Sequence, residues 1–388
     1  MELTILMPCL NEAKTVAASV AEAKAYLRQS GVEGEVLVSD NGSDDGSQAL
    51  AVQAGARVVH ASVRGYGAAL IEGIRQAKGR FVIMGDCDLS YDFSQLDGFM
   101  TQLRAGAALV MGNRFDGQIM PGAMPVLHRY LGNPVLSFIG RLFFRTHIGD
   151  FHCGLRGFDR AEILKLNLVL PGMEFASEMV VKAALAKLPM TEVPTTLRPD
   201  GRDRPPHLRT WHDGWRHLRF LLLFCPRWLF LYPGAVLTLI GLLIGGLVQQ
   251  GPFQLFGLGL GIHTLLYMGG AVVLGVQMIF LALIIKWVGV LSGVVPAPFW
   301  IRAWPRCLGV EAGVLSSMLL FAMGLYGSAT EFLFWQQQGF SGLDPAVMMR
   351  RTIPAVTLMI IGGQMGTSTL LAAALHSLWM STGRTSRP

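Results

Sequence analysis

The second half of the chain contains four apolar runs that are each long enough to cross a lipid bilayer. They lie at residues 228–249, 259–286, 309–335 and 352–380, and they hold very few charged side chains. A transmembrane helix needs about 20 apolar residues, because each residue adds about 1.5 Å of length and the hydrocarbon layer is about 30 Å thick. These runs therefore predict a domain of four transmembrane helices at residues 228–388.

The first half of the chain has a different pattern. Residues 1–226 carry charges throughout, although the whole chain of 388 residues is 52% hydrophobic and 15% charged, which is too apolar for a purely soluble protein. Strands are expected at 3–7, 35–39, 57–60, 81–84 and 109–112, with helices at 15–29, 48–54, 67–78 and 95–104 between them. Alternation of this kind predicts a mostly parallel sheet with helices on both faces. The predicted fold class is an α/β domain followed by an α-helical membrane domain.

A third segment joins the two domains. The stretch "TWHDGWRHLRFLLLF" at residues 210–224 reads as an amphipathic helix with aromatic anchors that lies in the membrane interface. The expected boundaries are therefore 1–208 for the α/β domain, 209–227 for the interface helix and 228–388 for the membrane domain.

The basic residues near the apolar runs predict the orientation of the chain. They gather before the first run, between the second and third, and after the fourth: Arg209, Arg216, Arg219, Arg227, Lys286, Arg302, Arg306, Arg384 and Arg387. Cytoplasmic segments are richer in basic residues, and no basic stretch typical of a signal peptide precedes the first strand. We therefore expect a multi-pass protein, typical of a bacterial inner membrane, with a cytoplasmic α/β domain. Arg350 and Arg351 lie on the opposite side and do not fit this pattern.

The overall charge and the cysteines narrow the possible partners. The formal charge of +6 is concentrated near the membrane segments, which indicates anionic lipid headgroups and argues against a nucleic-acid partner. The five cysteines are odd in number, widely spaced and without a C-x-x-C motif, so reduced thiols are expected. The oligomeric state stays open, and a homo-oligomer is compatible with the sequence.

Five of the predicted strands are each followed by a motif of unusual polar residues. These motifs are "MPCLNE" (7–12), "SDNGSDDGS" (39–47), "RGYGAAL" (64–70), "GDCDLSYD" (85–92) and "MGNRF" (111–115). Ligands of parallel α/β sheets bind at the carboxyl ends of the strands. The sequence therefore predicts one ligand site at this edge of the sheet. Because no G-x-G-x-x-G motif follows the first strand, a dinucleotide-binding oxidoreductase is disfavoured.

The fourth motif predicts a metal site. Asp86 and Asp88 directly follow an apolar strand, and like charges this close repel one another unless a cation joins them. Mg²⁺ or Mn²⁺ fits, because these ions prefer oxygen ligands and bridge diphosphate oxygens. Asp92 is either a further ligand or a cap of the helix that begins near Ser94.

Taken in order, these motifs resemble glycosyltransferase family 2, and within it the dolichol-phosphate mannose or glucose synthase-like members. The resemblance covers about residues 1–225 and rests on "PCLNE", "DNGSDDGS", "GDCD", "GNRF", "DFHCGLRGF" and a late basic loop. It implies a GT-A nucleotide-sugar-binding fold. It also implies an inverting, metal-dependent transfer of a hexose, glucose or mannose, from a UDP- or GDP-sugar to a polyprenyl phosphate of the dolichyl or undecaprenyl type.

The resemblance further implies roles for individual residues. Contacts to the nucleotide sugar are implied for Pro8, Asn11, Glu12, Asp40, Gly65, Gly67 and Asp86, and metal binding for Asp86 and Asp88. For Gly65 and Gly67 a second reading stays open, that they only end one element and begin the next. The sequence departs from the family pattern at Asn41, where a second acidic residue is usual, and at Cys153, where a serine is usual.

Four arginines match positions that the family uses for the acceptor phosphate. They are Arg114, Arg129, Arg202 and Arg204, and the residues implied to be catalytic are Asp88, Arg114 and Arg129. Arg204 would take the role of a lysine in the basic loop of relatives. No convincing general base is found, which suits a phosphate acceptor that is already ionised near neutral pH.

Three other functions stay open on the sequence alone. A processive polysaccharide synthase would share the fold and the membrane helices, but its usual Q-x-x-R-W motif is absent. Another type of membrane glycosyltransferase is the second alternative. A non-catalytic protein that binds a lipid carrier is the third, and the intact Asp86 and Asp88 pair argues against it.

Overall fold

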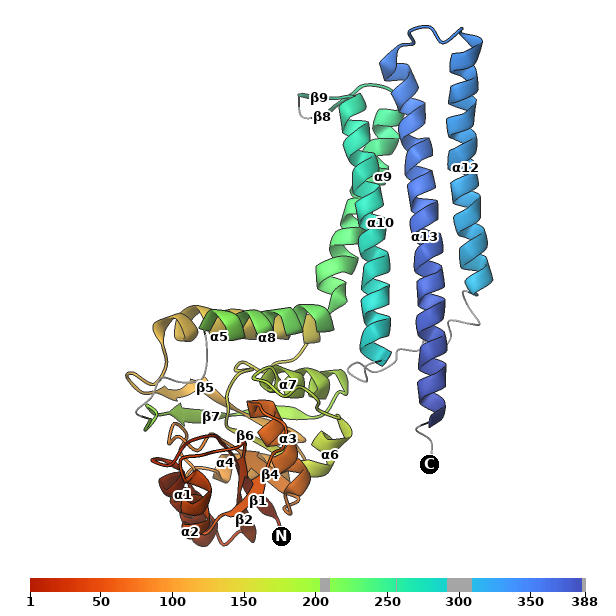
Figure 1. Cartoon of the computed structure of the whole chain (residues 1–388). Coiled ribbons are helices and arrows are strands. Elements are labelled where there is room, and N and C mark those ends of the chain that lie inside the picture. The colour runs from red at the N-terminus through yellow and green to blue at the C-terminus, as the bar shows by residue number, and fades with distance from the viewer. Residues whose placement is uncertain (203–209, 256, 292–308, 386–388) are drawn as a thin grey trace. The chain divides into compact units, whose positions relative to one another are not determined.

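The computed structural model describes residues 1–202, 210–255, 257–291 and 309–385. The chain divides into two compact units, Met1–Leu221 and Leu222–Pro388 (Figure 1). The first unit is the α/β domain, and the second contains the apolar helices. Arg204, Arg209, Arg302, Arg306 and Arg387 lie outside the described residues.

The first unit is built on a seven-stranded sheet with the order β3-β2-β1-β4-β6-β5-β7. Its strands are β1 (Leu3–Cys9), β2 (Gly34–Asp40), β3 (Arg57–His60), β4 (Phe81–Met84), β5 (Leu109–Ile119), β6 (Arg156–Asp159) and β7 (Met190–Leu197). β1 pairs in parallel with β2 and β4, β5 pairs in parallel with β7, and β6 runs antiparallel to its neighbours β4 and β5. The prediction of a mostly parallel sheet is confirmed. The motif that contains β6 did not suggest a strand.

The first unit also contains helices. They are α1 (Val16–Ser30), α2 (Ser47–Gln53), α3 (Tyr66–Gln76), α4 (Asp97–Arg104), the π-helical turn η1 (His128–Gly132), α5 (Asn133–Phe144), α6 (Arg160–Lys165), α7 (Phe175–Leu185) and α8 (Thr210–Phe224). In α1, Val16, Val20 and Ala23 recur at helical spacing, and all are fully buried in the core that includes β1. The same core contains the alternate residues of β1, so the periodicity of each element directs its apolar face inward.

Two helices of this unit leave apolar side chains exposed. In α8, His217, Phe220 and Leu221 are buried, whereas Trp215 is 58% exposed. The sequence correctly predicted a helix here. It did not reveal that α5 has a similar surface, on which Phe138 is also 58% exposed. Figure 1 shows α5 and α8 on the same side of the sheet.

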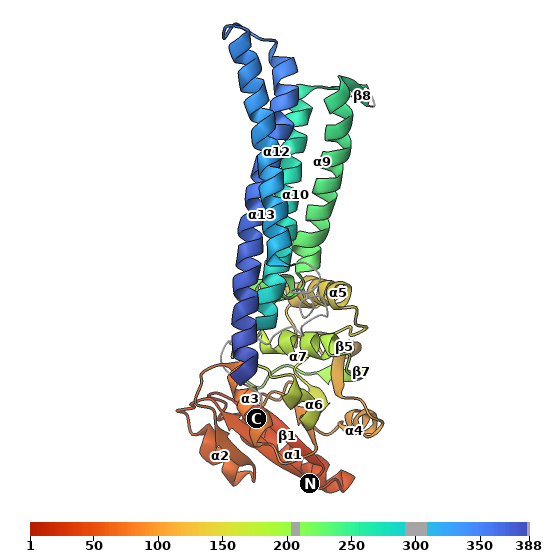
Figure 2. The same cartoon turned by 90° about the vertical axis from the view of Figure 1, so that its right-hand side faces the viewer.

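Among its described residues, the second unit contains four helices that are long and apolar enough to span a membrane, as predicted. The spans are Arg227–Gln250, which comprises the π-helical turn η2 (Arg227–Leu231) and α9 (Tyr232–Gln250), then Ile262–Leu291 (α10), Val310–Gln337 (α12) and Pro345–Ser381 (within α13, Pro345–Thr385). A short hairpin of β8 (Phe253–Leu255) and β9 (Leu258–Leu260) joins the first two. α9 packs on α10, α12 on α13, and α10 on α13, as Figure 2 shows.

The structure explains the two arginines that do not fit the charge pattern of the sequence. Arg350 donates a hydrogen bond of 2.5 Å from Nη1 to the carbonyl oxygen of Val248, near the end of α9. Arg351 forms an ion pair with Glu331 of α12, with 3.5 Å between Nη1 and Oε1. Both guanidinium groups therefore have partners within the helix bundle.

Candidate active site

The acidic motif after β4 is restrained by its neighbours. Asp88 is only 5% exposed, and its Oδ1 accepts hydrogen bonds from the amide of Ser90 at 3.0 Å and the hydroxyl of Ser90 at 2.5 Å. Its Oδ2 lies 3.0 Å from Nη1 of Arg202. Burial and the charge of Asp88 raise the pKa of Asp86 to about 6, although Arg202 and a hydrogen bond from Tyr66 act in the opposite direction. The two carboxylates thus repel each other when both are ionised.

The donor chemistry of this pair fits a divalent cation that shares its coordination with a ligand. Among the described residues, no group of three or more His, Cys, Asp and Glu side chains is placed to hold a metal ion. Mg²⁺ often binds through one or two carboxylates and completes its shell with phosphate oxygens and water. Asp92 does not cap the following helix, because α4 begins only at Asp97. Its Oδ1 accepts from the amide of Ser94 at 3.0 Å and its Oδ2 pairs with Arg198.

The loops after β1 and β2 are joined by hydrogen bonds. Asn11 adopts a left-handed conformation with φ of 58°, and its Oδ1 accepts from the amide of Asp44 at 2.9 Å. The amide of Glu12 donates to the hydroxyl of Ser47 at 2.8 Å. Pro8, which precedes these residues, accepts from the thiol of Cys87 through its carbonyl oxygen at 3.1 Å. The expected nucleotide loop and the acidic motif are therefore in direct contact.

Asp40 and Asn41 at the end of β2 have different roles. Asp40 is fully buried, its Oδ2 accepts from the amide of Gly42 and from Gln48, and its buried Oδ1 has no hydrogen-bond partner among the described residues. Asn41 accepts from the amide of Gly65 at 2.6 Å and donates to the carbonyl oxygen of Val63 at 2.7 Å. A carboxylate cannot donate, so the departure from the family pattern at Asn41 has a structural reason.

The two glycines after β3 have a packing reason. A Cβ atom on Gly65, whose φ is +136°, would lie 2.1 Å from the carbonyl oxygen of Pro171, and one on Gly67 would lie 2.3 Å from that of Leu170. The loop that contains Pro171 is held by Glu178, which is fully buried and accepts hydrogen bonds from the amide of Leu170 at 2.9 Å. Close packing of two loops is thus sufficient to require both glycines.

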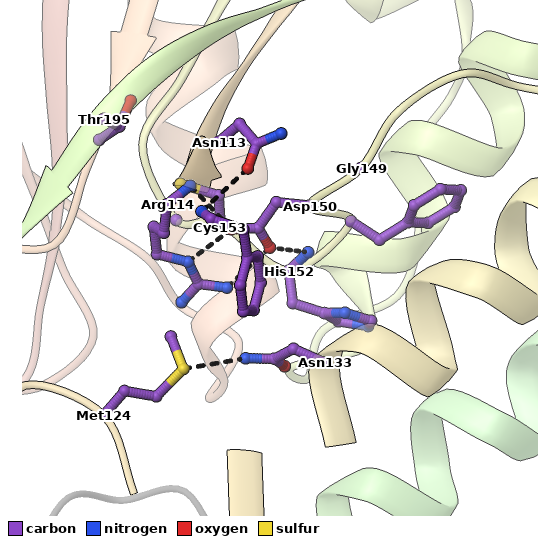
Figure 3. Close-up of polar contacts among 12 residues, drawn as sticks. Asn113, Arg114, Met124, Asn133, Gly149, Asp150, His152, Cys153 and Thr195 are labelled. Carbon is purple, nitrogen blue, oxygen red and sulfur yellow. Dashed lines mark hydrogen bonds and ion pairs between the residues drawn. The ribbon is translucent and has the colours of Figure 1, made fainter. Parts of the chain in front are cut away.

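Arg114 is held rigidly at the end of the regular part of β5. Its Nε and Nη2 lie 2.7 and 2.8 Å from the two carboxylate oxygens of Asp150 (Figure 3). The two side chains are 9% and 0% exposed. Burial alone would lower the pKa of Arg114, but the charge of Asp150 outweighs it and raises the pKa above the usual value. Glu192 of β7 in turn accepts from the amides of Gly149 and Asp150 at 2.8 and 3.1 Å, which fixes the loop that holds Arg114.

Arg114 also separates two cavities of the first unit. A polar cavity of about 180 Å³ is lined by Asp86, Asp88 and the segment around Arg198. A larger, mainly apolar cavity of about 390 Å³ lies between η1–α5, α7 and α8. Its apolar lining comprises Leu127, Leu131, Val135, Leu136, Met173, Ala176, Trp215 and Leu218. Arg114, His128 and Asn133 line both cavities, so a molecule with an anionic head and an apolar tail has a place for each part.

Two histidines of the apolar cavity, His128 and His152, have lowered pKa values. Burial, followed by the proximity of His217, lowers the pKa of His152 well below its usual value. Burial and the charge of Arg114 lower the pKa of His128. His217 and His152 both contact the hydroxyl of Ser177, at 2.8 Å from Nδ1 and 3.3 Å from Nε2 respectively. Such histidines are weak bases and leave Arg114 as the cation shared by the two cavities.

The remaining residues expected to bind the acceptor phosphate lie in different surroundings. The guanidinium of Arg129 lies 5.6 Å from the centre of the Tyr130 ring. Arg129 is not among the residues that line the two cavities within the described part of the chain, although its neighbour His128 is. Arg202 contacts Asp88 and Glu12, and Arg204 lies outside the described residues.

Sequence reasoning missed His128 and Asn133. Both occur in "HRYLGN", which was read only for its arginine, and the π-helical turn His128–Gly132 gives the chain a local irregularity at this point. Turns of this type are frequent at functional sites, but no simple sequence pattern predicts them. Asn133 is additionally held by a hydrogen bond of 3.6 Å from its Nδ2 to the sulfur of Met124 (Figure 3).

The sequence of this chain is similar to those of known glycosyltransferases. Residues 4–165 match the model of glycosyl transferase family 2, and residues 283–376 match the glycosyltransferase family 2 C-terminal transmembrane region. The low-salt glycan biosynthesis hexosyltransferase Agl6 of Haloferax volcanii is 34% identical over 381 residues, which are 96% of this chain and 89% of that protein. A dolichyl-phosphate hexose transferase of the same organism is 27% identical over 199 residues, 51% of this chain and 83% of that protein.

One solved structure is similar to part of this chain. The glucosyl-3-phosphoglycerate synthase of Mycobacterium tuberculosis, in complex with Mn²⁺, UDP and glucosyl-3-phosphoglycerate, has a TM-score of 0.46 and 21% identity, covering 58% of this chain and 80% of that one. The near full-length similarity to Agl6 and the two family matches confirm the resemblance seen in the motifs. This chain is an integral membrane protein with a GT-A domain, and it belongs to glycosyltransferase family 2.

Proposed function

We propose that this glycosyltransferase moves a hexose from a UDP- or GDP-sugar to a polyprenyl phosphate, with inversion at the anomeric carbon and with help from Mg²⁺ or Mn²⁺. The supporting observation is the position of Arg114, which lines a polar cavity with the acidic pair and an apolar cavity behind it. The name of the dolichyl-phosphate hexose transferase relative supports the same class of acceptor.

The shape of the site suits a lipid phosphate. We infer that the phosphate of the acceptor contacts Arg114 and that the first units of its tail enter the apolar cavity. A buried guanidinium neutralises a phosphate well, because its hydrogen bonds to ionised oxygens are stronger than neutral ones. The ion pair with Asp150 keeps this guanidinium in place before the acceptor arrives, so little energy is spent on reorganisation.

The reaction then requires no general base. A phosphate monoester has a second pKa of about 6 and is mostly dianionic at pH 7. One of its oxygens forms a bond to the anomeric carbon, the bond from that carbon to the donor diphosphate breaks, and the electron pair leaves on the diphosphate oxygen. No proton has to move. The low basicity of His128 and His152 agrees with this mechanism.

Asp86 and Asp88 would hold the divalent ion, which when bound supplies positive charge to the leaving diphosphate. The chain's own contribution is to keep these carboxylates close to Arg114, so that two anionic groups can approach each other in one cavity. Asp40, Asn11 and Glu12 lie at the neighbouring strand ends, where we infer that the nucleoside part of the donor binds.

We infer that the exposed apolar faces of α5 and α8 contact the lipid surface and that the α/β domain is cytoplasmic. Besides Trp215 of α8, the exposed residues Val135, Phe138 and Leu142 recur at helical spacing on α5, and a contiguous apolar patch typically marks a membrane or protein contact. The inferred boundaries of the interface segment, 209–227, and of the two flanking domains belong to the same proposal.

The decisive experiment uses the purified full chain, a panel of labelled UDP- and GDP-hexoses and three acceptors: a polyprenyl phosphate, the matching polyprenol and a water-soluble phosphate monoester. Label should enter the organic phase only with the polyprenyl phosphate. Equal transfer to polyprenol would show that the phosphate is not the acceptor group. A growing polymer would instead indicate a processive synthase, and no transfer from any donor would favour a non-catalytic carrier protein.

Three variants make this test specific. Asp88→Asn should abolish transfer, whereas Asp92→Asn, which changes a carboxylate that pairs with Arg198, should retain most of it. Ala176→Trp fills the apolar cavity, so it should raise the KM for long polyprenyl phosphates and leave nucleotide-sugar binding unchanged. Unchanged kinetics with Ala176→Trp would show that the tail binds elsewhere.

A further inference from the structure

Arg202 contacts Asp88, one of the acidic residues that line the polar cavity. Its Nη1 lies 3.0 Å from Oδ2 of Asp88, and its Nε donates a hydrogen bond of 2.8 Å to Oε1 of Glu12. The arginine side chain is 16% exposed, and the two carboxylates are 6% and 5% exposed. A guanidinium thus joins the loop after β1 to the acidic motif after β4.

The main chain places Arg202 at this position. The amide of Arg198 donates to the carbonyl oxygen of Ser90 at 2.8 Å, and the amide of Gly201 donates to that of Asp88 at 2.9 Å. These bonds continue the bridge between Tyr91 and Leu197, so the segment after β7 runs antiparallel along the acidic motif. Arg202 therefore reaches Asp88 through an ordered backbone.

Three carboxylates act on Arg202. Burial lowers the pKa of Arg202, but the charges of Asp88, Glu12 and Asp86 outweigh it and raise this pKa above its usual value. A buried carboxylate that loses its cationic partner is costly, so the metal-free protein needs this contact. Because Oδ1 of Asp88 already accepts two hydrogen bonds from Ser90, Oδ2 is the oxygen that Asp88 could offer to a cation, and Arg202 contacts this oxygen.

We propose that Arg202 is an exchangeable counter-ion, which neutralises Asp88 and Glu12 in the metal-free enzyme and must release Asp88 before a divalent cation binds. The proposal rests on the metal requirement in the proposed function. Since the chain supplies two carboxylates to the ion and Arg202 competes for one, the ion should bind weakly alone. A nucleoside diphosphate offers both further ligands for the ion and a new anionic partner for Arg202, so the two should bind together.

The test measures Mn²⁺ binding directly, by electron paramagnetic resonance of free Mn²⁺, in the full chain without any acceptor. Wild type should bind Mn²⁺ weakly alone and more tightly with UDP or GDP. Arg202→Met should tighten nucleotide-free binding by about tenfold or more, because the protein no longer has to break an ion pair first. The same variant should have a lower Tm without metal, and Mn²⁺ should restore it.

Arg198→Met is the matched control. It removes an arginine from the same segment, but Arg198 pairs with Asp92 and Glu22 and not with Asp88, so its Mn²⁺ affinity should stay at the wild-type value. Equal Mn²⁺ affinity in wild type and a folded Arg202→Met would overturn this inference and leave the proposed function intact. Absence of Mn²⁺ binding in wild type even with UDP or GDP would refute the metal requirement itself, and the inference with it.

Discussion

Removing Arg114 should affect both stability and catalysis, and the structure allows the two effects to be separated. Arg114→Met leaves the carboxylate of Asp150 fully buried and without the two charge-assisted hydrogen bonds of 2.7 and 2.8 Å. Breaking a buried ion pair on one side typically costs about 3–5 kcal/mol. In a domain of this size, that corresponds to a fall in Tm on the order of 10 °C.

The double variant Arg114→Met with Asp150→Asn removes the unpaired charge as well. Its Tm should recover at least half of the loss, because no ionised group is then left buried without a partner. In both variants, kcat/KM for the lipid phosphate should be roughly 10²- to 10³-fold below the wild-type value, since the cation shared by the two cavities is missing in both.

The assays are thermal unfolding of the purified protein and transfer of labelled hexose at varied polyprenyl phosphate. Arg104→Met is the control, because it breaks a bidentate ion pair with Glu2 on an exposed surface and should leave both Tm and transfer unchanged. Wild-type transfer by the double variant would refute the reasoning, because Arg114 would then serve only to neutralise Asp150.

Three further predictions concern the glycine turn, the acidic pair and the membrane unit. Gly65→Ala should lower Tm strongly, because its Cβ would lie 2.1 Å from a main-chain oxygen, whereas Gly42→Ala, also at positive φ but with open space around it, should cost only about 1 kcal/mol. The pKa of Asp86 is raised from 3.8 to about 6, so between these two pH values the folded metal-free protein keeps a proton that the unfolded chain has released. The stability of the protein should therefore fall as pH rises from 3.8 to about 6. Asp86→Asn should remove this slope in unfolding experiments at varied pH. Arg351→Leu should change the free energy of unfolding in detergent by less than about 1 kcal/mol, because the arginine of its 3.5 Å ion pair with Glu331 is 58% exposed. A larger loss would show that this pair holds α12 to α13.

The sequence alone determined the division into an α/β domain and four membrane helices, because both signals are local. The length of an apolar run predicts a membrane helix without reference to the rest of the chain. Along residues 3–112, the spacing of apolar residues alternates between that of strands and that of helices, because each element buries its own apolar face. The same pattern located Asp86, Asp88, Asp40 and Arg114 at one edge of the sheet, since parallel strands carry their ends to a common edge.

Tertiary structure alone decided how these residues are paired. The partner of Arg114 is Asp150, 36 residues away, and that of Arg202 is Glu12, 190 residues away. A linear pattern holds no information about such pairs, because they depend on strand order and on which loops meet above the sheet. The apolar cavity depends in the same way on α5, α7 and α8 meeting in space. The sequence could therefore predict the chemistry of the site, whereas the packing of distant segments decided which arginine faces both cavities.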